Sequence, residues 1–150
     1  MNTREEYMKE ALLLAEEAGK NEEVPIGCII VSEDGTILAR ARNRCREDRD
    51  ATAHAEMLAI KAAEEVLASP HLEGCTLYVT TEPCPMCAGA ILHTRISQIV
   101  FGCSEPATGS CGSVLNLFEE RYGHHPAIYG GVCAEESQTL LRDFFDGLRA

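Results

Sequence analysis

The 150-residue sequence has no long hydrophobic run. Its longest apolar stretch, Ile26 to Val31, has the length of a β-strand and falls far short of the ~20 residues that a membrane-spanning helix needs. The first twenty residues mix charged and apolar side chains, which is not the pattern of a secretory signal. We therefore expect no membrane span and a cytoplasmic protein.

Basic residues are also scarce. The sequence has 13 Lys and Arg against 24 Asp and Glu, a formal net charge of −11. Such a protein repels polyanions at long range, which disfavours a nucleic-acid partner. Basic side chains are concentrated in one stretch, for which there are two interpretations. It is either a solvated edge strand whose charges prevent aggregation, or a surface beside the site that contacts phosphates. The stretch contains Arg40, Arg42, Arg44, Arg46 and Arg49.

No internal repeat, low-complexity tract or linker divides the sequence, so residues 1–150 are predicted to form one domain. Hydrophobic periodicity and turn signals predict five strands separated by helices, which favours an α/β protein: a three-layer α/β/α sandwich with a five-stranded mixed sheet. Strands are expected at 25–32, 37–44, 76–80, 98–102 and 127–129. Helices are expected at about 7–18, 52–68, 83–94, 114–121 and along a final stripe formed by Leu140, Leu141, Phe144, Phe145 and Leu148.

Eight cysteines do not indicate a disulfide scaffold here, because the chain is large for that class and carries no secretion signal. Cys28 and Cys103 lie in or beside strand-like runs and are interpreted as core residues. Cys45, Cys75, Cys111 and Cys133 have no informative spacing. Cys84 and Cys87 differ from these six because they are three residues apart at the start of a predicted helix.

His54 and the pair Cys84 and Cys87 form a candidate zinc site. A catalytic zinc ion takes three protein ligands and keeps one position open. His54 and the cysteine pair each lie at the predicted N-terminus of a helix. At such a position the helix dipole favours the thiolate form of cysteine. A redox Cys-x-x-Cys pair would leave His54 and Glu56 unexplained, and a structural zinc site would need a second Cys/His pair at finger-like spacing, which the sequence lacks.

Glu56 is the candidate general acid/base. Two thiolates and a neutral histidine cancel the charge of one Zn²⁺ ion, so the metal cluster offers little positive charge to activate a substrate. Glu56 stands two residues from His54 and is predicted to move protons between the attacking water, the substrate ring and the leaving group. If Glu56 were a ligand instead, the open position would be lost.

These residues match the H-x-E…P-C-x-x-C signature of zinc deaminases. The chain resembles the cytidine-deaminase-like superfamily, and within it the bacterial tRNA adenosine deaminases. The resemblance runs nearly end to end. The matching segments are Glu23-Val24-Pro25-Ile26-Gly27, Thr52-Ala53-His54-Ala55-Glu56, Leu77-Tyr78-Val79-Thr80, Glu82-Pro83-Cys84-Pro85-Met86-Cys87-Ala88-Gly89-Ala90, Arg95-Ile96, Val100-Phe101-Gly102 and Asp143-Phe144-Phe145.

The resemblance implies a homodimer with one zinc ion per chain that converts wobble adenosine to inosine in tRNA. Asn43 matches the asparagine that contacts the target nucleotide in that family, although a strand-end asparagine that bonds its own turn is the alternative. Glu82, in the matched segment before the cysteines, is predicted as a second substrate-binding residue.

Charge leaves the substrate open. From Cys103 onward the chain has three basic residues against seven acidic ones, and the loop at 103–113 lacks the lysine usual in the family. A deaminase of a free base or nucleoside, such as guanine or cytosine, is therefore the alternative to a tRNA enzyme. A catalytically silent binding subunit is disfavoured, because Glu56 is present.

Overall fold

The computed structural model describes residues 2–149, and its elements follow the predicted alternation of helices and strands. The order is α1 (Arg4–Lys20), β1 (Gly27–Val31), β2 (Ile37–Arg42), α2 (Ala55–Leu67), β3 (Thr76–Thr81), α3 (Pro85–Thr94), β4 (Gln98–Cys103), the 3₁₀-helix η1 (Leu117–Glu119), β5 (Ala127–Tyr129) and α4 (Ala134–Arg149). The predicted strand at 127–129 agrees in both bounds, and the other strands differ by one or two residues at their ends.

The five strands form one mixed sheet in the order β2-β1-β3-β4-β5. β1 pairs antiparallel with β2 and β3, whereas β4 runs parallel to β3 and β5. The Asp34-Gly35 turn joins β1 and β2 in the expected hairpin, and α3 makes the expected crossover between β3 and β4. β2 is an edge strand of the sheet.

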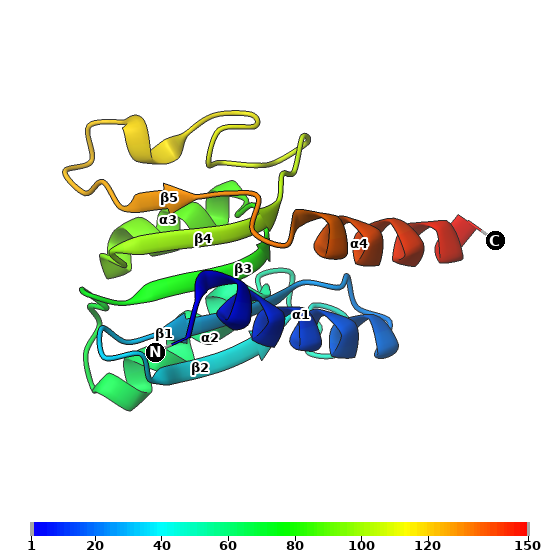
Figure 1. Cartoon of the computed structure of the whole chain (residues 1–150), viewed down its shortest axis with the longest axis horizontal. Helices are drawn as coiled ribbons and strands as arrows, with labels where there is room; N and C mark the ends of the chain where they lie inside the picture. Colours follow the sequence, from blue (N-terminus) through cyan, green and yellow to red (C-terminus); the bar gives the residue numbers. More distant parts are fainter. Residues whose placement is uncertain (1, 150) are drawn as a thin grey trace.

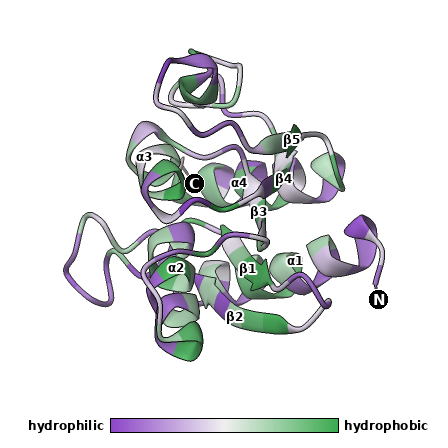
Figure 2. Cartoon of the chain, turned by 90° about the vertical axis from the view of Figure 1, so that its left-hand side faces the viewer, coloured by the Kyte–Doolittle hydropathy of each residue, from purple (hydrophilic) through white to green (hydrophobic). Residues whose placement is uncertain are grey.

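Helices cover both faces of this sheet, which gives the predicted three-layer arrangement (Figures 1 and 2). α2 and α3 lie on one face, where Ala59, Ile60 and Ile91 pack against the side chains of the central strands. α1 and α4 lie side by side on the other face, where Met8 and Leu12 pack against Ile29 and Tyr78. Each face therefore has its own apolar core.

Strand directions bring three loops to one edge of the sheet. β2 and β3 are both antiparallel to β1 and therefore run in the same direction, and β4 is parallel to β3. The segments that follow these strands begin at Asn43, Glu82 and Ser104. Because the carboxyl ends of co-directional strands meet at the same edge, residues widely separated in sequence become neighbours there.

Two sequence expectations are wrong in part. The helix expected at 114–121 is only the 3₁₀ turn η1, because Asn116 is extended and its side chain accepts a hydrogen bond from the Phe118 amide at 3.0 Å. The apolar residues of α4 do not all face the core as expected, since Phe145 and Leu148 are 41% and 65% exposed. Figure 1 shows the end of α4 extending past the sheet, where no other helix or strand within residues 2–149 covers it.

All eight cysteines are free, and Cys28 and Cys103 are buried, as expected for core residues. No helix among residues 2–149 combines the length and apolar character that crossing a bilayer requires.

Candidate active site

The first half of the site is the N-terminus of α2. His54 is the N-cap residue, with extended backbone angles, but its side chain makes no capping hydrogen bond. The Oδ1 atom of Asn43 instead accepts a hydrogen bond from the Ala55 amide at 2.8 Å. Asn43 thus satisfies a donor that the helix start would otherwise leave unpaired, and the imidazole of His54 is free to turn toward the cysteines.

The second half is the N-terminus of α3. Cys84 is the N-cap residue, Pro85 occupies the first turn, and Cys87 lies one turn further along the same face. Like His54, Cys84 makes no side-chain capping bond. Both helix starts therefore direct a metal-ligand side chain away from its own helix.

The three candidate ligands converge. The Sγ atoms of Cys84 and Cys87 lie 3.6 Å and 3.5 Å from Nδ1 of His54, and the three atoms form the metal-compatible His/Cys/Asp/Glu group found within residues 2–149. A tetrahedral zinc ion, with bonds of about 2.1 Å to nitrogen and 2.3 Å to sulfur, would hold these atoms roughly 3.6 Å apart. The donor set and its spacing fit one zinc ion per chain.

Hydrogen bonds among the three candidate ligands shift their pKa values in different directions. The hydrogen bond from Cys87, followed by the one from His54, lowers the pKa of the Cys84 thiol to about 4. The same contact with Cys84, reinforced by burial, raises the pKa of Cys87, and the hydrogen bond to Cys84 raises that of His54. A thiolate beside a proton-rich pair is the arrangement that a divalent cation replaces when it displaces protons from its ligands.

Glu56 lies at the second position of α2 and is 4% exposed. Burial raises the pKa of its carboxyl group to about 7, against opposing contributions from the local backbone and from His54. A hydrogen bond also links it to Cys87. The carboxyl group therefore faces the cysteine pair from the neighbouring helix, and a group with this pKa exchanges protons readily near neutral pH.

The Glu82 carboxylate lies against the loop that follows β4. Its two carboxylate oxygens accept hydrogen bonds from the amides of Glu105, Cys111 and Ser113, at 3.0, 2.9 and 3.1 Å, and from the hydroxyl of Ser113. Burial disfavours its charge, but these hydrogen bonds together lower its pKa. The loop after β4 thus engages both carboxylate oxygens, and the contact of Glu82 with substrate stays a prediction.

The basic stretch is divided between buried and exposed side chains. Arg42 is 9% exposed and forms an ion pair with Glu47, with 2.6 Å between Nη1 and Oε1. Arg44 pairs with Asp48 at 3.1 Å. The exposed members of the stretch are Arg40, Arg46 and Arg49.

The sequence analysis did not identify one residue that supports the site, Glu23. Glu23 is 2% exposed, and its carboxylate accepts hydrogen bonds from the amides of Arg46 and Glu47 at 3.2 and 2.8 Å. It thereby fixes the loop that follows Asn43. The matched segment beginning at Glu23 was the available signal, but a lone acid before a strand does not reveal which distant amides it will meet.

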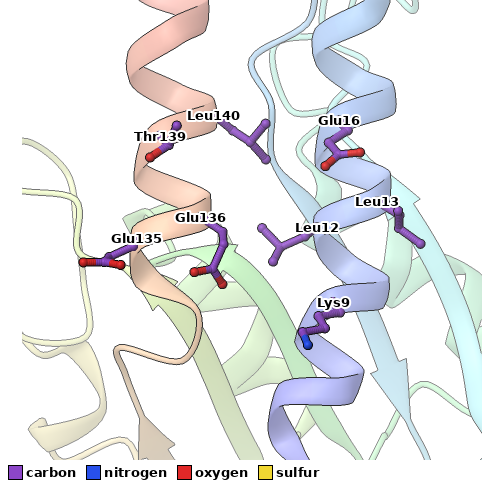
Figure 3. A pocket seen from close by; sticks show the side chains of 8 residues that line it. All are labelled: Lys9, Leu12, Leu13, Glu16, Glu135, Glu136, Thr139 and Leu140. Carbon is purple, nitrogen blue, oxygen red and sulfur yellow. The ribbon is translucent and has the colours of Figure 1, made fainter.

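A groove of about 650 Å³ lies away from this site, between α1 and α4 (Figure 3). Leu12, Leu13 and Leu140 form its apolar part, and Glu16, Glu135 and Glu136 bring negative charge to it. None of its lining residues is a predicted site residue. The reactive groups are instead gathered at the sheet edge.

Comparison with known proteins agrees with this geometry. Residues 1–103 match the family described as the cytidine and deoxycytidylate deaminase zinc-binding region. The matched part covers both helix starts and all three candidate ligands. The chain belongs to this family, and its fold is the cytidine-deaminase-like fold.

Several relatives match this chain over nearly its whole length. It is 46% identical to a tRNA-specific adenosine deaminase of Bacillus subtilis over 150 residues, 99% of this chain and 92% of the relative. A structure from a study of A-to-I editing by tRNA:A34 deaminases at the wobble position of transfer RNA matches with a TM-score of 0.87 and 43% identity, and covers 91% of this chain and 99% of the other.

Longer relatives contain only a segment like this chain. A tRNA(Ile)-lysidine synthase of Deinococcus radiodurans is 46% identical over 142 residues, 95% of this chain. The chain spans about a quarter of the length of that protein, 24%.

Proposed function

We propose that the chain is a zinc-dependent hydrolytic deaminase that acts on the C–N bond of a nucleobase, and that it converts adenosine to inosine at the wobble position of tRNA. The observation that carries this proposal is the buried Glu56 carboxyl group beside the converging His54, Cys84 and Cys87. The names of the full-length relatives supply the substrate.

His54, Cys84 and Cys87 would hold the zinc ion, which when bound supplies the positive charge that activates a water molecule. Glu56 accepts a proton from the water that attacks C6 of adenine and delivers a proton to the ring nitrogen N1. It then carries the proton that the departing amine needs. The C6–N bond breaks, ammonia leaves, and the water oxygen becomes the carbonyl oxygen of inosine.

Asn43 is proposed to orient the target nucleotide. Its Oδ1 atom is engaged by the Ala55 amide, so its Nδ2 group is the part available to donate to a substrate acceptor. The side chain is only 6% exposed and is fixed next to His54. A donor held in this way loses little entropy when substrate binds.

A tRNA partner is supported by two kinds of relatives. The full-length ones are named for tRNA, and the segment resembling this chain in Deinococcus radiodurans belongs to a protein also named for a tRNA reaction. Arg46 and Arg49 are exposed in the loop between β2 and α2, and Arg40 is exposed on β2; all three are proposed to contact phosphates. Because these contacts are electrostatic, the binding is expected to weaken as salt is raised. The net charge of −11 opposes it most at low salt, where long-range repulsion is least screened.

The test compares two kinds of substrate. Purified protein is incubated with a wobble-adenosine anticodon stem-loop and, separately, with a panel of free bases and nucleosides. We expect inosine in the RNA. Ammonia released only from a small heterocycle would overturn the tRNA proposal and favour the alternative, a free-base or nucleoside deaminase, which the acidic surface supports.

A Glu56→Ala variant tests the proton role. We expect it to keep one zinc ion per chain and to lose more than about 10³-fold in kcat, within the range of acid–base catalysis. Glu73→Gln, which removes an exposed acid outside the site, is the control and should retain full turnover. Loss of zinc in the Glu56 variant would contradict the assigned role.

We also propose a homodimer, a single domain over residues 1–150 and a cytoplasmic location, as expected from the sequence and the resemblance. Exposed apolar side chains support self-association: Val66 and Leu67 at the end of α2 are 62% and 41% exposed. Sedimentation equilibrium would give twice the chain mass, and a monomer at micromolar concentration would contradict the dimer.

A further inference from the structure

Residues 105–113, here called the β4 segment, fold around one carboxylate. Oε1 of Glu82 accepts from the Glu105 amide and the Ser113 hydroxyl, and Oε2 accepts from the amides of Cys111 and Ser113. The bonds engage both ends of the segment. Because Glu82 is 4% exposed, water has little access to compete for these donors.

Gly109, in the middle of the segment, passes directly over the same carboxylate. A Cβ atom at Gly109 would lie 2.3 Å from Cδ of Glu82 and 2.4 and 2.5 Å from its two oxygens. The next residue, Ser110, is fully buried, and its amide donates to the Pro83 carbonyl at 2.9 Å. Only a residue without a side chain fits where the backbone crosses Glu82.

These anchors lie immediately before the metal ligands. Glu82 and Pro83 directly precede Cys84, and the Glu82 amide donates to the Cys103 carbonyl at 2.9 Å, at the end of β4. Because the Ser110 amide binds the carbonyl of Pro83, the residue before Cys84, the β4 segment lies beside the metal-ligand group.

We propose that Glu82 is a positioning residue that holds the β4 segment as a preformed wall of the substrate site. This inference rests on the proposed function. The segment contains no Lys or Arg, so the wall acts through shape and backbone hydrogen bonds rather than through phosphate charge. If the wall were not held, each binding event would have to order it, at a cost in conformational entropy that appears as weaker binding.

The experiment uses Glu82→Gln. The NH2 group of glutamine would face backbone N–H groups that now donate to a carboxylate oxygen, so at least one of these hydrogen bonds is lost. We expect unchanged zinc content, kcat within about twofold, and KM for the stem-loop raised about tenfold, the equivalent of one lost hydrogen bond. Hydrogen exchange of the segment amides should accelerate about tenfold or more. Glu120→Gln, an exposed acid in the same half of the chain, is the matched control.

Two further variants keep the proposal testable if Glu82→Gln folds poorly. Gly109→Ala displaces the segment while Glu82 stays intact, with Gly89→Ala, which has open space around it, as the control. Ser113→Ala removes one donor. Both should raise KM in the same direction, Ser113→Ala by less.

Three outcomes would overturn the inference. Unchanged exchange of the segment in Glu82→Gln would show that Glu82 does not hold it. Faster exchange with unchanged KM would show that the segment is not a wall of the site. Lower kcat and zinc content with unchanged KM would indicate a general structural role. If the wild-type protein forms no inosine in RNA, the proposed substrate fails separately, and KM is then measured on the heterocycle that is deaminated.

Discussion

The Oδ1 atom of Asn43 accepts a hydrogen bond from the Ala55 amide at 2.8 Å, although twelve residues separate them. The contact joins the end of the edge strand β2 to the start of α2. It serves as a helix cap supplied from another element, in place of the N-cap residue His54. The two halves of the Asn43 amide thus have different tasks: the oxygen stabilises the helix, and the nitrogen is proposed to meet the substrate.

Replacement of Asn43 can separate these tasks. Asn43→Ala should lower the free energy of unfolding by about 1 kcal/mol, as for other lost caps, and should reduce kcat/KM. Asn43→Asp keeps an oxygen for the Ala55 amide but has no donor, so it should unfold near the wild-type midpoint and still lose kcat/KM. Urea unfolding and steady-state kinetics measure both. An active Asn43→Asp protein would contradict the proposed contact.

Loss of one thiol should release the metal. Cys84→Ser is expected to weaken zinc binding by more than about a hundredfold, because loss of an outer-shell partner alone costs 10–100-fold. Competition with a chromogenic chelator measures the affinity. Cys45→Ser, which replaces a half-buried cysteine outside the ligand group, should keep wild-type affinity. Equal affinity in the two variants would contradict the ligand assignment.

The ion pair between Arg42 and Glu47 predicts a pH-dependent contribution to stability. The hydrogen bond from Arg42 lowers the pKa of Glu47, so the folded state binds fewer protons at this group than the unfolded state. Its contribution is therefore present above the unfolded pKa of about 4.3 and is lost as the pH falls through the lower folded value.

Unfolding of wild type and Glu47→Gln should thus differ most at roughly pH 6–7 and converge as the pH falls through the lowered folded pKa, where the side chain at position 47 is uncharged in both proteins. Glu73→Gln serves as the control, because Glu73 is exposed and lies outside these ion pairs. A difference between wild type and Glu47→Gln that is constant across this pH range would show that the lost stability is not due to the charge.

The sequence suffices to group the three candidate zinc ligands, because the pattern that identifies them lies within short segments. Cys84 and Cys87 are one helical turn apart, and His54 begins another helix, so helix starts and spacing suffice to group them. The roles of Glu23 and Glu82 are not local. Their carboxylates bind amides 23 to 31 residues away, and nothing in the sequence indicates which backbone donors the strand ends bring to them.

The amphipathic pattern of α4 wrongly predicts the burial of its last apolar residues, also because burial depends on distant parts of the chain. Phe145 and Leu148 continue the apolar stripe of α4, but burial also needs a partner surface, and the sheet ends before the helix does. Hydrophobic periodicity identifies the helix and its inner face. The position at which the sheet ends depends on the packing of the whole domain.

The contact between α1 and β1 gives the final prediction. A Cβ atom at Gly27 would lie 2.0 Å from the Ala11 carbonyl oxygen and 2.8 Å from the Ala15 amide nitrogen, both backbone atoms in the middle of α1. Backbone within a helix cannot move aside as a side-chain end can. Gly27→Ala should therefore force α1 away from the sheet and cost about 1–3 kcal/mol or more of unfolding free energy, as other overpacked cores do.

Gly89→Ala is the matched control, since a Cβ there meets nothing within 4 Å and Gly89 lies inside α3. It should stabilise the protein by about 0.5–1 kcal/mol, because alanine has the higher helix propensity. Opposite shifts of the urea midpoint in the two variants would support close packing of α1 on β1. Equal shifts, or a wild-type midpoint for Gly27→Ala, would show that α1 packs less closely on the sheet than the structure indicates.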